Sequence, residues 1–181
     1  MMKICRFIFK YGWIPLLAFP FCSFAADPPS KVIESCLAFK AMSSRISIEE
    51  LDEPGVLSDD FMSGYSTFTY QRNGIAFGYA TSRGSRADKI VFGMQKRPIS
   101  SAKPIDKVRP ERLDPTLAEF GVIHYQSSTY MCISSNFDGI GRSGSFQNVR
   151  FGYIALLTGK DGAAFMGPLY FSVRDIRTFK R

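Results

Sequence analysis

The sequence predicts an α+β fold in which a twisted antiparallel β-sheet of six or seven strands carries one N-terminal helix packed on it. Most apolar segments alternate with a period of two, which is typical of half-buried strands. One segment, at residues 30–43, has helical spacing instead. Two cysteines remain after removal of an expected signal peptide, and in an exported chain they predict one disulfide.

The first 25 residues have the pattern of a secretory signal peptide. Three bases precede an uncharged and largely apolar run at 11–21, and Ser23-Phe24-Ala25 is a small-x-small cleavage pattern. The run is shorter than the ~20 residues of a membrane-spanning helix. We therefore expect residues 26–181 to form a single β-rich globular domain that is periplasmic or secreted, with no transmembrane segment after cleavage.

The charge of the chain argues against a nucleic-acid partner. The formal net charge is +7, and removal of the three signal-peptide bases lowers it to +4. A modest basic excess favours solubility and weak attraction to anionic polymers. A nucleic-acid-binding protein needs a clustered basic face, which is not evident here.

Cys36 and Cys132 are the only cysteines that follow the predicted cleavage site. They allow a single intramolecular pairing, and the resulting disulfide would close a loop of about 97 residues. The chain-entropy model gives ~4.7 kcal/mol for a loop near that length. A catalytic thiol is the alternative interpretation of either residue.

The predicted helix at 30–43 has an apolar stripe that includes one of these cysteines. Ile33, Cys36, Leu37 and Ala41 recur at helical spacing. The disulfide is therefore expected to fix this helix to the sheet.

The clearest strand pair is a hairpin at 65–81, because two alternating segments flank Asn73-Gly74, the strongest short-range hairpin signal. In its second strand, Ala76, Gly78 and Ala80 form a small-residue face. That face either lies close to another backbone or a ligand, or simply permits sheet twist.

The remaining strands are predicted from short apolar segments. Val149 to Leu157 is apolar on both faces, so it should lie in the centre of the sheet. The other predicted strands are 90–92, 120–123, 130–133 and 169–173. Of these, 120–123 and 130–133 are expected to form a second hairpin.

Residues 97–118 form a long Pro-rich connection that holds four of the ten prolines. A loop of this length in a compact domain is usually functional or disordered. The connection contains three acids and five bases. The bases are Arg97, Lys103, Lys107, Arg109 and Arg112. We therefore expect this loop to contribute to a surface that binds a protein partner with an acidic surface. The alternative is a solvated connector.

Gly139 to Gly144 matches the pattern GxGxxG, but a β pattern follows it rather than a helix. A dinucleotide site needs the helix, so no cofactor is predicted. Two interpretations remain, a flexible turn, or a loop whose backbone N–H groups and Arg142 hold an anionic group of a partner.

His124 is the only histidine in the chain, so neither a zinc site nor any other metal site is predicted. A catalytic triad would have to use His124 with Ser127, Ser128 or Asp138. Its position in a predicted strand favours a structural or surface role instead. The acidic segment 49–60 does not match calcium-loop spacing and is interpreted as a solvated surface. No residue is assigned as catalytic.

These observations favour an exported, non-enzymatic protein-binding domain, such as an inhibitor or immunity-type protein that acts on an envelope enzyme or toxin. In build alone, the chain is similar to bacterial lysozyme inhibitors and to immunity proteins against envelope-targeting toxins, although it has no residue motif of either group. One alternative is an exported hydrolase or toxin that uses His124. The other is a structural subunit of a surface assembly that pairs through an open sheet edge. The sequence leaves the partner and the oligomeric state open.

Overall fold

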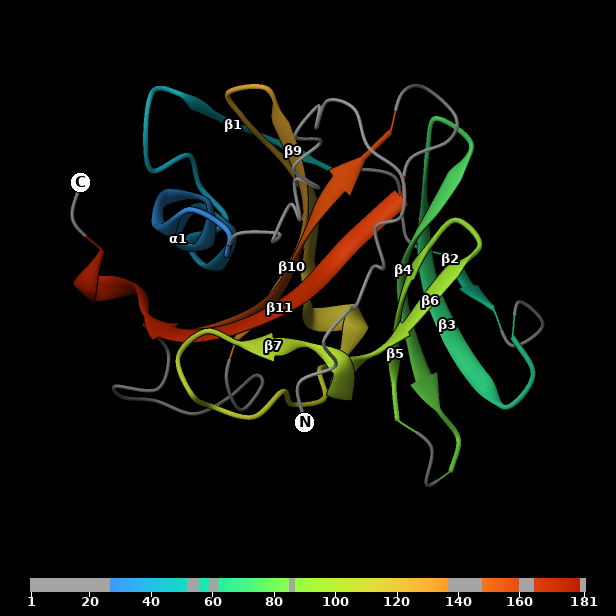
Figure 1. The fold of residues 1–181 in the computed structure, drawn as a ribbon. Coiled ribbons are helices and arrows are strands. Elements are labelled where there is room, and N and C mark those ends of the chain that lie inside the picture. The colour runs from blue at the N-terminus through green and yellow to red at the C-terminus, as the bar shows by residue number, and fades with distance from the viewer. Residues whose placement is uncertain are drawn as a thin grey trace, which may run out of the picture.

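The computed structural model describes residues 27–51, 56–58, 62–84, 87–136, 148–159 and 165–179. These residues are mostly β and form two sheets that lie face to face. The single α-helix that they contain covers the outer side of the larger sheet (Figure 1). The predicted fold class, a helix packed on a largely antiparallel β structure with one disulfide, is confirmed.

The larger sheet has six strands in the order β1-β8-β9-β10-β11-β7. Their bounds are β1 Ile46–Glu50, β7 Lys103–Pro104, β8 Glu119–Tyr125, β9 Ser128–Asn136, β10 Val149–Thr158 and β11 Phe165–Asp175. Neighbouring strands are antiparallel, except that β7 runs parallel to β11. Because β10 lies between β9 and β11, the predicted central position of Val149 to Leu157 is confirmed. The pairing of β8 with β9 likewise confirms the second hairpin.

The smaller sheet has five antiparallel strands in the order β2-β3-β4-β5-β6. Their bounds are β2 Val56–Ser58, β3 Tyr65–Arg72, β4 Ile75–Ser82, β5 Lys89–Phe92 and β6 Gln95–Pro98. The predicted hairpin is β3 and β4. Asn73 and Gly74 both have left-handed φ angles, 50° and 74°, as a type I′ turn requires.

Gly78 explains the small-residue face of β4. A Cβ atom added there would lie 2.0 Å from the Phe68 carbonyl oxygen and 2.7 Å from Thr69 Cα. Both atoms belong to β3, which pairs with β4. At Gly78 the small face therefore does meet a backbone at close range, but that backbone is the neighbouring strand of the same hairpin.

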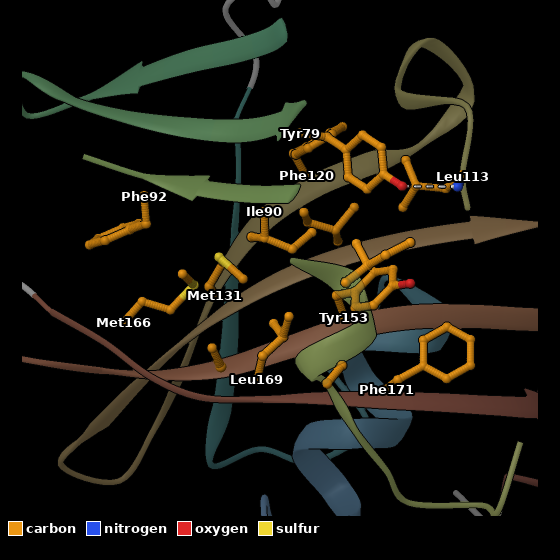
Figure 2. Close-up of a cluster of buried hydrophobic side chains, with 14 of the residues drawn as sticks. Tyr79, Ile90, Phe92, Leu113, Phe120, Met131, Tyr153, Met166, Leu169 and Phe171 are labelled. Carbon is orange, nitrogen blue, oxygen red and sulfur yellow. Dashed lines mark hydrogen bonds between the residues drawn. The ribbon is translucent and has the colours of Figure 1, made fainter. Parts of the chain in front are cut away.

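The main core fills the space between the two sheets (Figure 2). Aromatic side chains dominate it, and Tyr79, Phe77, Tyr153 and Phe171 are almost completely buried. Burying a large apolar side chain contributes roughly 1.5–3 kcal/mol, so this core is a main source of stability. The Pro-rich connection also contributes three buried residues to the core: Ile99, Ala102 and Leu113.

A second core lies between the larger sheet and α1 (Ser30–Ala38). Val32, Ile33 and Leu37 of the helix pack against residues of β8, β9 and β10. The predicted disulfide is present, and it joins Cys36 to Cys132 of β9 with a Cα–Cα distance of 5.6 Å. The helix is therefore fixed covalently to the sheet, as expected.

The helix is shorter than predicted and ends at Ala38 rather than at residue 43. Phe39 adopts a left-handed conformation with φ of 46°, and the amides of Phe39 and Lys40 bond to the carbonyl oxygens of Cys36 and Ser35. This is a typical C-terminal cap. The Phe39 ring packs over Gly121 of β8, where an added Cβ would lie 2.9 Å from Phe39 Cζ. Docking of Phe39 on the sheet thus overrides the helical spacing of Ala41.

The prediction of a single sheet with six or seven strands was wrong in its count. The described residues form eleven strands in two sheets. The four unpredicted strands are β1, β2, β6 and β7, and each of them forms an edge of its sheet. Edge strands tolerate short length and exposed charged residues, so they lack the alternation that marks the inner strands.

Candidate functional site

The strongest candidate site lies in the Pro-rich connection, at residues 105–113, which we call the clamped loop. Its first end follows β7, which pairs in parallel with β11 through Lys103 and Pro104. The amide of Ile105 then donates to the Phe171 carbonyl oxygen at 2.8 Å. The loop therefore begins from a fixed position on the edge of the larger sheet.

Asp106 forms the first anchor of the clamped loop. Its carboxylate accepts hydrogen bonds from the Ser172 hydroxyl, from the Val173 amide at 3.3 Å and from Arg174 Nε at 3.1 Å. The next residue, Lys107, has a left-handed φ of 61°, which is uncommon for a residue with a side chain. The three bonds to Asp106 help to hold this turn, after which the chain leaves the sheet.

Two tyrosines anchor the other end. The Tyr153 hydroxyl donates to the Glu111 carbonyl oxygen at 2.5 Å, and the Leu113 amide donates to the Tyr79 hydroxyl at 3.4 Å (Figure 2). Burial is the main cause that raises the pKa of both tyrosines well above the usual range. Both hydroxyl groups therefore stay protonated, and the one on Tyr153 remains a donor to the loop.

Asp88 completes this second anchor from inside the core. The residue is only 1% exposed, and its carboxylate accepts bonds from the Tyr79 hydroxyl at 2.9 Å, the Ser82 amide at 2.8 Å and Arg112 Nε at 2.9 Å. A buried carboxylate is very costly without such partners. Arg112 itself is largely exposed, so it links the surface of the clamped loop to the core.

Between the anchors lies the tip of the loop, which we define as residues 107–110. Lys107 and Arg109 are exposed, and within the described part of the chain neither has a hydrogen-bond or ion-pair partner. Val108 between them is 38% exposed. Among the described residues, the tip therefore presents two unpaired cations on a segment whose two ends are fixed.

Two of the sequence-predicted bases bond to other segments of this chain. Arg97 is half-buried and donates to the Met166 carbonyl oxygen at 3.0 Å, which joins β6 to β11. Lys103 is exposed and forms an ion pair with Asp27 at 2.7 Å. Both side chains therefore hold neighbouring segments of this chain together.

The other bases fall into two groups. Lys107, Arg109 and Arg112 lie on the clamped loop within six consecutive residues, where only Arg112 has a carboxylate partner among the described residues. Arg142 and the glycine-rich segment around it lie outside the described residues.

Sequence reasoning missed the anchors Asp106, Asp88, Tyr79 and Tyr153. Each bonds to a residue that is distant in the chain, 24 positions away for Asp88 and Arg112, and 68 for Asp106 and Arg174. Local periodicity carries no signal for such contacts. The Tyr79 position was predicted to be in a strand, but nothing in the sequence connects its hydroxyl with the loop.

His124 lies on β8 with a polar group near each ring nitrogen. Nε2 is 3.4 Å from Glu49 Oε2, and Nδ1 is 3.3 Å from Thr129 Oγ1. The hydroxyl beside the ring therefore belongs to Thr129 rather than to the predicted Ser127 or Ser128. Asp138 lies outside the described residues.

The carboxylate beside His124 is already engaged. Arg72 of β3 bonds both oxygens of Glu49, at 2.8 and 2.7 Å, and this is the main reason why the pKa of Glu49 is lowered to about 2. The contacts favour an exposed link between the two sheets, and the hydrolase alternative stays a prediction.

Two cavities border other parts of the fold. One of about 590 Å³ lies between residues 38–44 and the side chains of Ile176 and Phe179, and neither His124 nor the tip lines it. The other, of about 190 Å³, is lined by Pro and Tyr side chains near Asp27.

Across the described ranges, no cluster of three or more metal-ligating side chains occurs. Nor does any helix in that part of the chain have the length and apolarity to cross a bilayer.

Comparison of the chain with protein-family models, with curated proteins and with solved structures finds no match.

Proposed function

We propose that this protein is an exported, non-enzymatic binding domain that contacts an acidic surface of a protein partner through the tip of its clamped loop. One observation carries the proposal. Lys107 and Arg109 are exposed and unpaired among the described residues, on a loop with anchors at Asp106 and at Glu111 to Leu113.

A loop with fixed ends suits binding because less conformational freedom is lost when the partner orders it. Pro110 restricts the backbone further next to Arg109. The two cations raise the rate of association with an acidic surface, and that rate falls as salt is added. Together these features support an inhibitor or immunity-type role against an envelope enzyme or toxin.

The disulfide supports the location that this role requires. Disulfides such as Cys36–Cys132 persist in oxidising compartments and are rare in the cytosol. Together with the signal peptide expected at 1–25, this favours a periplasmic or secreted protein.

The test is capture of partners from envelope extract with the mature protein. A double variant, Lys107→Ala with Arg109→Ala, removes the two tip cations. Its matched control, Lys40→Ala with Arg45→Ala, removes one lysine and one arginine that are exposed in the segment after α1. We expect a stoichiometric partner that binds the wild type and the control but not the tip variant. Absence of any partner, or equal capture by all three proteins, contradicts the proposal.

The second candidate is a hydrolase that uses His124. It is favoured by the Glu49 carboxylate and the Thr129 hydroxyl on either side of the ring. Turnover of an envelope substrate that disappears in both His124→Ala and Thr129→Val would establish it. Turnover that persists in either variant excludes this arrangement.

A further inference from the structure

The cavity of about 190 Å³ near Asp27 has the properties of a peptide-binding site. We propose that it takes a proline residue from an extended segment of a partner protein, and that the Tyr130 hydroxyl donates a hydrogen bond to a carbonyl oxygen of that segment. The cavity lies on the outer side of the larger sheet, next to Pro29 at the start of α1, and none of the tip residues lines it. This second binding surface is therefore independent of the tip.

A β-bulge in β11 shapes one side of the cavity. The register between β10 and β11 shifts at Leu156, where two residues of β11, Gly167 and Pro168, stand opposite one residue of β10. Proline cannot donate to the ladder, so within a sheet it is found at edges and at bulges of this kind. A bulge also re-aims the side chains next to it. Leu156 and Pro168 both line the cavity, together with Pro28 and Pro29 from the segment before α1.

The Tyr130 hydroxyl is an unused hydrogen-bond donor in this cavity. Tyr130 is only 7% exposed and belongs to the second core, yet its hydroxyl has no hydrogen-bond partner among the described residues. In that part of the chain, Arg150 Nε is the one fully buried side-chain polar atom without a partner, so the Tyr130 hydroxyl reaches solvent. It does so through the cavity that Tyr130 lines. A ligand that fills the cavity displaces the water there and must therefore bring a hydrogen-bond acceptor.

The size and the lining of the cavity favour one apolar residue of a larger partner. Sites that enclose a whole drug-sized ligand measure about 300–1,000 Å³, which is more than the 190 Å³ found here. A sugar would bring several hydroxyl groups that each need a partner when buried. The Asp27 carboxylate of the lining is already bonded to Lys103 at 2.7 Å, and the Lys103 ammonium also lies 5.9 Å from the centroid of the Tyr170 ring.

Proline meets these requirements better than other apolar residues do. Its nitrogen carries no hydrogen, so burying it leaves no amide donor unpaired. An extended Pro-rich segment has no internal hydrogen bonds, and its carbonyl oxygens are free to accept one from a tyrosine. Several peptide-recognition domains bind such segments in aromatic-lined grooves. Here Tyr130 and Tyr170 supply two aromatic rings, and Pro28 of this chain is already buried in the same lining.

The experiment titrates the isotope-labelled mature protein with an acetylated and amidated hexaproline and follows the NMR shifts of its amides. A Gly-Ser peptide of the same length and with the same end groups is the control ligand. We expect saturable shifts at Tyr130 and Tyr170 with hexaproline and none with the Gly-Ser peptide. Tyr130→Phe removes only the hydroxyl, so it should weaken hexaproline binding by about 2- to 10-fold. Tyr70→Phe, which removes a hydroxyl from β3 of the smaller sheet, should leave the affinity unchanged.

A second variant, Leu156→Trp, places a larger side chain in the lining and should abolish the shifts. Absence of saturable shifts in the wild type, equal shifts with the Gly-Ser peptide, or equal affinity of the wild type and Tyr130→Phe overturns the proposal. The Lys107→Ala and Arg109→Ala double variant should bind hexaproline as the wild type does. Loss of hexaproline binding and loss of tip-dependent capture are therefore separate results.

Discussion

Tyr79 and Tyr153 belong to different sheets, yet their hydroxyl groups bond to the same short stretch of the clamped loop. Tyr153 donates to the Glu111 carbonyl oxygen, while Tyr79 accepts from the Leu113 amide and donates to Asp88. This end of the loop is therefore held where the two sheets are packed together. The same core that stabilises the fold also sets the position of the exposed cations.

Removal of either hydroxyl should loosen the loop. Tyr79→Phe takes one donor from the buried Asp88 carboxylate, so we expect a loss of about 1–3 kcal/mol in the free energy of unfolding. Tyr153→Phe should cost less, about 0.5–1.5 kcal/mol, because it removes a single bond to a carbonyl group. Urea denaturation measures both losses. Hydrogen exchange of the Leu113 amide should become faster in Tyr79→Phe, and unchanged exchange would show that this anchor does not hold the loop.

The tip should be replaceable without loss of the fold, unlike the whole Pro-rich connection. Replacing residues 107–110 by Gly-Ser-Gly-Ser removes only exposed or half-buried side chains, so we expect stability within about 1 kcal/mol of the wild type. A Gly/Ser linker in place of 97–118 also removes Ile99, Ala102 and Leu113 from the core. Truncating Ile99 or Leu113 alone to alanine would cost about 2–5 kcal/mol.

Two measurements on these replacements separate binding from folding. Urea denaturation reports stability, and titration with the captured partner reports affinity. We expect the tip replacement to lose affinity while it stays folded. An unstable tip replacement would contradict the assignment of 107–110 as an exposed segment.

The inner strands of both sheets could be predicted from the sequence, and the edge strands could not. All seven predicted strands are present, and all of them are inner strands. An inner strand has a neighbouring strand on each side and a second layer packed on it, so its sequence needs a marked apolar pattern. An edge strand has a neighbour on one side only. In β6, Gln95, Lys96, Arg97 and Pro98 alternate between half-buried and exposed positions and contain no aliphatic residue. Its place in the sheet comes from pairing with β5, which no local pattern reveals.

The candidate site was predictable only in outline. The proline content marked residues 97–118 as a special connection, and the excess of bases indicated an acidic partner. Which bases are available for binding depends on distant contacts. Arg97 bonds to Met166, 69 positions away, and Lys103 to Asp27, 76 positions away, whereas Lys107 and Arg109 have no such contact among the described residues. Tertiary packing makes that selection, so it is absent from the sequence pattern.

The disulfide should contribute strongly to stability because it joins α1 to β9 across a separation of 96 residues. Either Cys36→Ser or Cys132→Ser is expected to lower the free energy of unfolding by roughly 2–5 kcal/mol. Denaturation of the natively purified protein with and without reductant provides the comparison. Detection of two reactive thiols after unfolding without reductant would mean that the bridge does not form in the purified protein.

The ion pair between Glu49 and Arg72 should make stability depend on pH in acid. The hydrogen bond from Arg72 is the main cause that lowers the pKa of Glu49 from 4.5 to about 2. Because the folded-state pKa is the lower one, the ionised carboxylate stabilises the fold above pH 4.5, and this contribution is lost as the pH falls from 4.5 toward 2. The Glu49 side chain is 45% exposed, so solvent screening limits the effect to about 1 kcal/mol or less.

Glu49→Gln should therefore be less stable than the wild type at pH 6 and nearly equal to it at pH 2, as measured by urea denaturation. Glu50→Gln, which changes the exposed neighbour, is the control. An equal difference between the wild type and Glu49→Gln at both pH values would show that the pair does not join the two sheets in solution.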